Sequence, residues 1–158
     1  MKFEPQRSER TEEIISSLSV KTFLTATAVI EAGAGLALLC VPSVTAVLLL
    51  GAPLETPAAL SVARIGGAAL LTLAVAMWFA RGDTQSRAVK GLVAAMVLYN
   101  LGAVVILGAA GVQWRAVGVA LWPAVVLHAA MTAWCIISLL RWKHEQDNRS
   151  SGGLLDRA

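Results

Sequence analysis

Long apolar runs separated by short polar connections dominate the sequence. Four of these runs approach the ~20 residues that a helix needs to cross a bilayer. With 57% hydrophobic and 15% charged residues, the chain has too little polar surface for an ordinary water-soluble domain. The pattern predicts an all-α bundle of four transmembrane helices within residues 22–142, with spans at 22–41, 57–80, 88–108 and 116–140.

Prolines divide the first half of the chain. Residues 20–50 as a single helix would be ~46 Å long, well beyond the hydrocarbon core of a bilayer. Pro42 is expected to end the first span, because a proline ring cannot continue a helix. The residues that follow it then form a short helix along the outer interface. Thr56 as N-cap and Pro57 at the first helical position are typical of a new start, here that of span 2.

The two ends of the chain are more polar than the spans. In residues 1–21, Ile14, Ile15 and Leu18 occur at helical spacing, which favours a short helix on the cytoplasmic interface. Residues 143–158 contain a polar run and a Ser-Ser-Gly-Gly segment, which is typical of a disordered cytoplasmic tail. The domain organisation predicted is therefore one membrane domain with two cytoplasmic extensions.

Basic residues are distributed unequally between the two sides of the predicted bundle. Eleven lie before span 1, between spans 2 and 3, or after span 4, whereas the other connections contain only Arg115. Lys and Arg in short flanking segments are retained on the cytoplasmic side. The bias predicts a multi-pass protein of the bacterial inner membrane with both termini in the cytoplasm. It also explains the net charge of +3, so the partner expected is the lipid bilayer and not nucleic acid.

The two cysteines do not predict a disulfide. Cys40 is expected near the outer surface and Cys135 nearer the inner one, too far apart in depth to bond within one chain. Neither belongs to a CxxC pair, so a thiol-redox function has little support.

Each predicted span contains one strongly polar residue away from its ends. A charged residue at the bilayer centre costs ~2.5–3.5 kcal/mol on insertion scales, and lipid offers no hydrogen-bond partners. Four such residues at similar depth are therefore expected to face a shared interior and to form a ligand- or proton-binding cluster. They are Glu31, Arg64, Asn100 and His128.

Neighbouring residues at helical spacing agree with that orientation. Thr27 shares a helix face with Glu31, and Thr132 shares one with His128. Tyr99 is next to Asn100 near the centre of span 3. We assign these three residues supporting roles and assign no residue a catalytic role.

Plainer explanations exist for each member of the cluster. Arg64 could pair with Glu31 or, with equal weight, extend to the outer surface, because helical side chains lean toward the helix N-terminus. Glu31 could instead be neutral, or bonded to Asn100 or His128. A lone histidine is more often structural than a metal or haem ligand, and no second mid-membrane histidine is present, so no metal is expected. Asn100 could simply make an interhelical hydrogen bond worth ~0.6–2 kcal/mol.

A functional interpretation is that Glu31 and His128 accept protons in a small cavity. Carboxyl and imidazole groups that are withdrawn from water can both exchange protons near neutral pH. This chemistry suits proton-coupled transport or a quinone-like redox site.

Four short spans and an Arg-x-Gly-Gly opening of span 2, here Arg64 to Gly67, resemble the small bacterial four-helix membrane proteins of the DoxX-like kind. The resemblance covers residues 20–142 and implies a membrane subunit associated with oxidoreductases or oxidative stress. The single glutamate of span 1 is also similar to that of the small multidrug exporters. The chain departs from those exporters by adding Arg64 and His128.

Together these features favour an accessory or small-ligand-binding membrane protein over an enzyme. A proton-coupled small transporter and a DoxX-like oxidoreductase subunit are the alternatives. No cofactor is required, although quinone or lipid would suit a polar cavity. Small-residue surfaces in spans 1 and 2 exceed what four short helices need internally, which favours a homo-oligomer or a membrane-protein partner.

Overall fold

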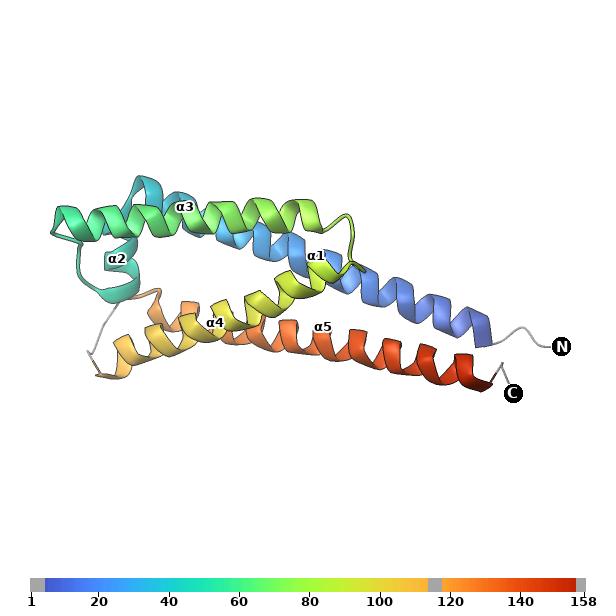
Figure 1. Ribbon diagram of the computed structural model, residues 1–158. Coiled ribbons are helices and arrows are strands. Elements are labelled where there is room, and N and C mark those ends of the chain that lie inside the picture. Colours follow the sequence, from blue (N-terminus) through green and yellow to red (C-terminus); the bar gives the residue numbers. More distant parts are fainter. Residues whose placement is uncertain (1–4, 114–117, 156–158) are drawn as a thin grey trace.

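The computed structural model describes residues 5–113 and 118–155, with side chains described in 18–113 and 118–144. All secondary structure in these residues is helical, as the sequence predicts. Four long helices extend along a common direction, and a short one lies at one end of the bundle (Figure 1). The elements are α1 (Pro5–Cys40), α2 (Pro42–Leu50), α3 (Pro57–Ala80), α4 (Arg87–Gln113) and α5 (Leu121–Leu155).

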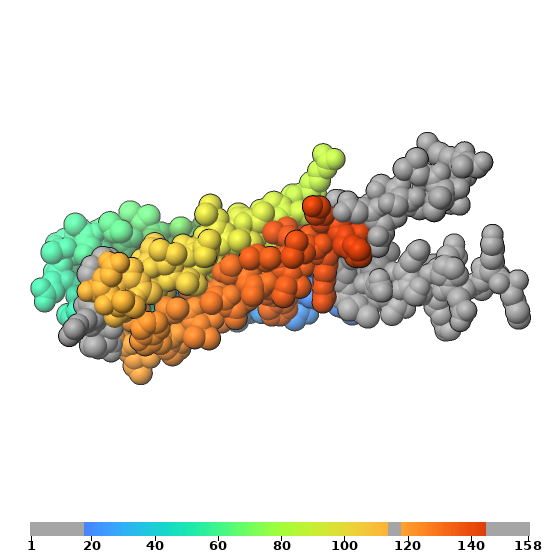
Figure 2. Space-filling model, turned by 90° about the horizontal axis from the view of Figure 1, so that it is seen from below, coloured from blue at the N-terminus to red at the C-terminus, as the bar shows by residue number. Residues whose placement is uncertain are grey.

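Four helices are long and apolar enough to cross a membrane, which confirms the predicted spans. Their candidate membrane segments are Leu18–Cys40, Pro57–Ala80, Arg87–Gln113 and Leu121–His144. Many large apolar side chains on them are exposed, including Ile65 at 70%, Phe79 at 78% and Leu98 at 75%. Exposure of so much apolar surface is unfavourable in water but favourable in the hydrocarbon core of a bilayer. Figure 2 shows α4 and α5 side by side on one face of the molecule.

The long helices associate as two pairs. α1 packs along α3, and α4 packs along α5, each more extensively than any other two elements. Contacts between the pairs are fewer and come mainly from α1 with α5 and from the short α2 with α5. The bundle therefore consists of two helical hairpins that meet along a limited boundary.

Two glycines bring the backbones of α1 and α3 together. A Cβ atom added to Gly67 would lie 2.7 Å from the carbonyl oxygen of Gly35, and one added to Gly35 would lie 2.8 Å from the carbonyl oxygen of Gly67. Real Cβ atoms do not approach a backbone oxygen so closely. Dispersion contacts over such closely packed backbones are a main source of helix association in lipid. Gly35 and Gly67 thus serve the contact between these two helices, whereas a Cβ atom at Gly33 or Gly66 would meet nothing within 4 Å.

The turn between α1 and α3 follows the proline and glycine signals. α1 ends at Cys40 and α2 begins at Pro42, which confirms the predicted break. Gly51 ends α2 in the left-handed conformation with φ of 81°, which only glycine adopts without strain. Thr56 then caps α3, because its side-chain oxygen accepts a hydrogen bond from the Ala59 amide at 3.1 Å.

α2 also ties the first hairpin to the second. The Ala120 amide donates to the Leu48 carbonyl oxygen at 2.8 Å, just before α5 begins. Gly118 lies so close to the backbone of Leu48 and Leu49 that no Cβ atom would fit there. This backbone contact positions the start of α5 at the α2 end of the bundle.

An apolar core fills the other half of the bundle and draws side chains from all four long helices. Phe23 of α1 lies against Trp134 of α5, with ring centroids 5.5 Å apart. Burial of these large side chains holds the two hairpins together near the turn between α3 and α4. The buried core consists of Val20, Phe23, Leu24, Ala28, Met77, Val89, Val93, Met96, Met131, Cys135 and Trp142.

The two ends of the chain differ from expectation. α1 is continuous from Pro5, so residues 5–21 belong to the first span's helix and do not form a separate interfacial one. α5 continues to Leu155, where the sequence predicted a disordered tail from residue 143. Lys, Glu, Gln and Arg are good helix formers, and extending a helix is far easier than starting one. Residues 1–4, 114–117 and 156–158, with Arg115 among them, lie outside the described residues.

The glycine contact predicts a selective response to one added methyl group. Gly67→Ala should lower the stability of the purified protein by about 1–3 kcal/mol, because the α1 backbone cannot move away without losing the pair. Gly66→Ala is the matched control, since a Cβ atom there would meet nothing within 4 Å. Thermal unfolding in mild detergent, followed by circular dichroism, compares the two. Equal melting temperatures would contradict the proposed role of this contact.

Candidate functional polar cluster

The polar cluster lies directly beyond the apolar core, on the same helix faces. Along α1, Glu31 follows the buried Phe23 and Thr27 at intervals of four residues. Along α4, Asn100 follows Met96, and along α5, His128 precedes Met131. Because the helical repeat keeps such residues on one face, the stripes that build the core also carry the polar side chains into the interior.

Glu31 is buried and takes its hydrogen bond from the other hairpin. Its side chain is only 3% exposed. The hydroxyl of Tyr99 on α4 donates to Oε2 of Glu31 at 3.2 Å. The other carboxyl oxygen, Oε1, accepts no hydrogen bond from the residues whose side chains are described.

Asn100 and His128 join α4 to α5 within the second hairpin. The side-chain amide of Asn100 donates to the Met96 carbonyl oxygen at 2.8 Å, so Oδ1 is left as the acceptor. His128 Nδ1 lies 2.8 Å from that Oδ1 and must therefore carry a hydrogen. In neutral His128 the free lone pair is consequently on Nε2.

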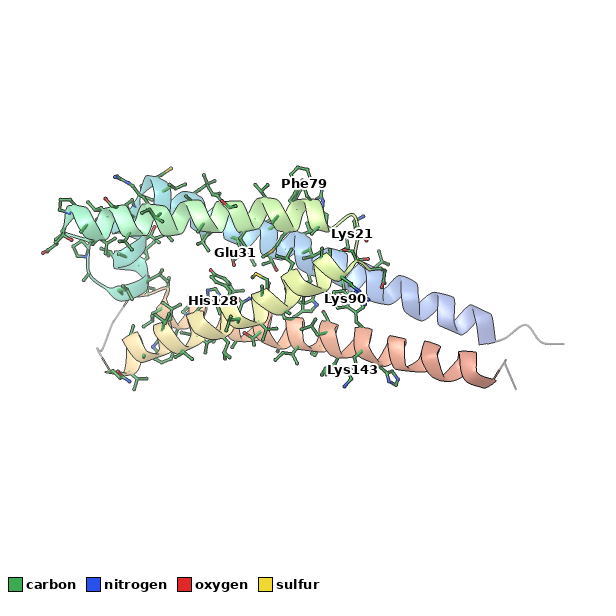
Figure 3. All side chains as sticks on the ribbon, viewed as in Figure 1. Lys21, Glu31, Phe79, Lys90, His128 and Lys143 are labelled. Carbon is green, nitrogen blue, oxygen red and sulfur yellow. The ribbon has the colours of Figure 1, made fainter. Side chains whose placement is uncertain are left out.

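The edge contact between Tyr99 and His128 connects these two sets of hydrogen bonds. Their ring centroids are 5.7 Å apart and their planes are inclined at 79°. Glu31, Tyr99, His128 and Asn100 thus form one contiguous group drawn from α1, α4 and α5. In Figure 3, Glu31 and His128 lie on opposite sides of the boundary between the hairpins and at similar positions along the bundle.

The two threonines share the predicted faces but bond locally. The Thr27 hydroxyl donates to the Phe23 carbonyl oxygen at 2.9 Å, and the Thr132 hydroxyl donates to the His128 carbonyl oxygen at 2.8 Å. Both bonds run to the preceding turn of the same helix. These threonines line the helix faces that carry Glu31 and His128 without contributing a hydrogen bond to them.

Arg64 does not join the cluster. Its side chain is exposed on α3 and makes no hydrogen bond or ion pair with the residues that the structure describes. The physical reason is that, among the described helices, α1 alone packs extensively along α3, so the buried stripe of α3 is narrow and passes through Gly67, Ala74 and Met77. A three-residue separation places Arg64 about 60° around the helix from Gly67, beyond the edge of that stripe. Of the two interpretations from sequence, pairing with Glu31 is not what the structure shows.

Tyr99 has a larger part in the cluster than its sequence position indicated. Tyr99 donates the hydrogen bond to Glu31. Sequence alone indicates Arg64, Asn100 or His128 as the partner of Glu31. One signal could have identified it. Tyr99 is the only tyrosine of the chain and lies in mid-span, whereas tyrosines of membrane proteins concentrate at the interfaces.

The cluster offers hydrogen-bonding and acid–base chemistry. Glu31 Oε1 and the free nitrogen of His128 are on opposite hairpins, and each can accept a hydrogen bond or a proton. Among the described residues, no group of three or more His, Cys, Asp or Glu side chains could hold a metal ion. Cys40 and Cys135 are free thiols, Cys40 exposed and Cys135 buried in the core.

Comparison with known proteins adds no family to this description. No family model matches the chain, and neither the curated proteins nor the solved structures contain a significant match. What the fold defines is the class: an all-helical bundle with four helices that can span a membrane.

The hydrogen bond between Asn100 and His128 should be measurable as a coupling free energy. In a double-mutant cycle of Asn100→Ala and His128→Ala, we expect a coupling of about 0.6–2 kcal/mol, the range of interhelical hydrogen bonds in membranes. Pairing Asn100→Ala with Ser61→Ala on the exposed face of α3 is the control and should be additive. Unfolding free energies in mild detergent provide the values. A coupling equal to that of the control would show that the two side chains do not interact.

Proposed function

We propose that this chain is an integral membrane protein that binds a small hydrogen-bonding ligand at the cluster of Glu31, Tyr99, Asn100 and His128. One observation carries the proposal. Glu31 is a buried carboxyl group whose only hydrogen-bond partner among the described side chains is a neutral phenol on another hairpin. Intramembrane ionisable residues are costly and usually serve a function.

The unused groups of the cluster define what the ligand must offer. Glu31 Oε1 can accept a hydrogen bond, and the free nitrogen of His128 can accept one or, when protonated, donate one. A small neutral or cationic molecule with hydrogen-bond donors matches these groups best. Because Glu31 is only 3% exposed, the ligand must be small or must enter as the hairpins separate.

The proposed environment is the bacterial inner membrane, with the start of α1 and the end of α5 toward the cytoplasm. Both lie at the same end of the bundle (Figure 1). α3 ends and α4 begins toward this same cytoplasmic side, and the turn that joins them is flanked by Arg81 and Arg87. Lys and Arg near membrane-spanning segments are retained in the cytoplasm.

Proton-coupled transport is the second candidate, and the division into two hairpins favours it. Glu31 is on one hairpin and its partner Tyr99 is on the other, so a change in the protonation of Glu31 acts on the boundary between them. Contacts across this boundary are fewer than those within each hairpin. Movement of one helical unit against another around a central site is the usual means of alternating access.

Removal of the Glu31 charge tests the binding function. We expect Glu31→Gln to retain at least tenfold less bound small molecule than the wild-type protein, because a hydrogen bond to a charged group contributes about 1.5–3 kcal/mol. Native mass spectrometry from mild detergent measures retained molecules, quinones among them, together with the subunit number. Arg64→Gln, which removes an exposed intramembrane charge, is the control and should retain the wild-type amount.

The same variants separate transport from binding alone. In proteoliposomes that contain a pH-sensitive dye, a proton-coupled transporter should move protons when a substrate identified by mass spectrometry is added, and Glu31→Gln should abolish this movement. Arg64→Gln should preserve it. If the wild-type protein binds the molecule but moves no protons, the transport candidate is rejected and the binding function stands. Retention of no molecule by the wild-type protein would reject both.

A further inference from the structure

Two adjoining hollows lie on the outer side of the first hairpin, away from the polar cluster. One is an apolar groove of about 260 Å³ between α1 and α3, lined by alanines such as Ala32 and Ala74 and by the side chains of Trp78 and Phe79. The other measures about 480 Å³ and is lined by Lys21, Trp78, Phe79, Arg81 and Gly82. Since both share Trp78 and Phe79, they form one continuous surface, which we call the α1–α3 groove.

The apolar part of the groove results from residue size. Ala28 and Ala32 on α1 face Ala74 on α3, so the helices leave a depression where larger side chains would fill the space. Phe79 at its end is 78% exposed, and Trp78 is 44% exposed. Figure 3 shows Phe79 on the side of α3 turned away from α4 and α5, with Lys21 near the same end of the helix.

The other part of the groove is positively charged. The guanidinium of Arg81 lies over the ring of Trp78, 3.3 Å from its centroid, which fixes the cation beside the apolar groove. Lys21 contributes a second cation from α1. Asp83 follows two residues after Arg81 but does not line the groove. Among the residues whose side chains are described, no acidic group lines this part of the groove.

We propose that the α1–α3 groove binds an anionic phospholipid, with the phosphate between Lys21 and Arg81 and part of one acyl chain along Ala32 and Ala74. Charge and polarity change along the groove in the order found in a lipid molecule, from an anionic headgroup to an apolar chain. The inference rests on the proposed membrane location, but it is independent of ligand binding at Glu31.

Charge and depth favour a lipid over a second copy of the chain. The groove's cations lie at the end of α3 that the charge bias places at the cytoplasmic surface, where anionic headgroups attract Lys and Arg. A second copy would have to present an acidic group at this depth next to an apolar ridge. Among the described acidic residues, Glu31 is buried, and Glu55 belongs to the turn before α3 at the opposite end. Asp83 does lie at this depth, but it belongs to the polar turn of residues 82–86, which contains no apolar side chain to fill the groove.

The test compares lipid retention by native mass spectrometry after addition of phosphatidylglycerol or phosphatidylcholine to the purified protein. The wild-type protein should retain phosphatidylglycerol in preference. Each cation near an anionic surface contributes about fivefold in affinity, so Lys21→Gln with Arg81→Gln should weaken phosphatidylglycerol retention by about 30-fold. Arg141→Gln with Lys143→Gln, which removes two exposed cations from α5, is the matched control and should leave retention within about threefold of wild type.

A second pair of variants tests the apolar part. Ala32→Leu fills the groove and should reduce retention of both lipids, whereas Ala76→Leu on the exposed side of α3 should not. The proposal is overturned if the two lipids are retained equally by the wild-type protein. It is also overturned if the two charge-removing pairs behave alike, or if Ala32→Leu changes the subunit number and not lipid retention. Glu31→Gln should bind phosphatidylglycerol normally, so loss at the cluster and loss at the groove are distinguishable.

Discussion

A buried carboxyl group that must find its hydrogen-bond donor inside the protein sets the central constraint on this bundle. Lipid can supply no donor, so Glu31 requires one from a neighbouring helix. Tyr99 provides it from the other hairpin. The position of α1 against α4 therefore depends on this hydrogen bond together with the apolar core beside it. Polar and apolar layers follow one another on the same helix faces, so both contribute to one interface.

Packing within the hairpins has a different origin. α1 and α3 approach until their backbones touch at Gly35 and Gly67, which gives dispersion contact over a large area without large side chains. Between the hairpins, large side chains such as Phe23 and Trp134 are in contact at one end, and the α2 backbone makes the connection at the other. The polar cluster lies between these two attachments. It thus occupies the part of the boundary between the apolar core and the α2 contact.

The surface of the first hairpin provides a second, separate chemistry. Arg81 and Lys21 lie beside an apolar groove on its outer side, whereas Glu31 faces inward from the same α1 helix. One helix pair therefore presents a charged and apolar face to the surroundings and a carboxyl group to the interior. Binding of a phospholipid on the outer face would hold α1 against α3 and would leave the boundary with α4 and α5 free to move.

Apolar run length and prolines alone determined four membrane-length helices, the break at Pro42 and the start of α3 at Thr56, because these follow from local backbone chemistry. Helical spacing also indicated that Glu31, Asn100 and His128 share interior faces. The choice of partner required the tertiary structure. Whether Glu31 meets Arg64, His128 or Tyr99 depends on which helices pair and how far each is rotated. Arg64 stays outside the cluster because other helices cover α3 on one side only. Tyr99 reaches the Glu31 carboxyl group because α4 passes close to α1. Neither helix arrangement can be deduced from the sequence of a single helix.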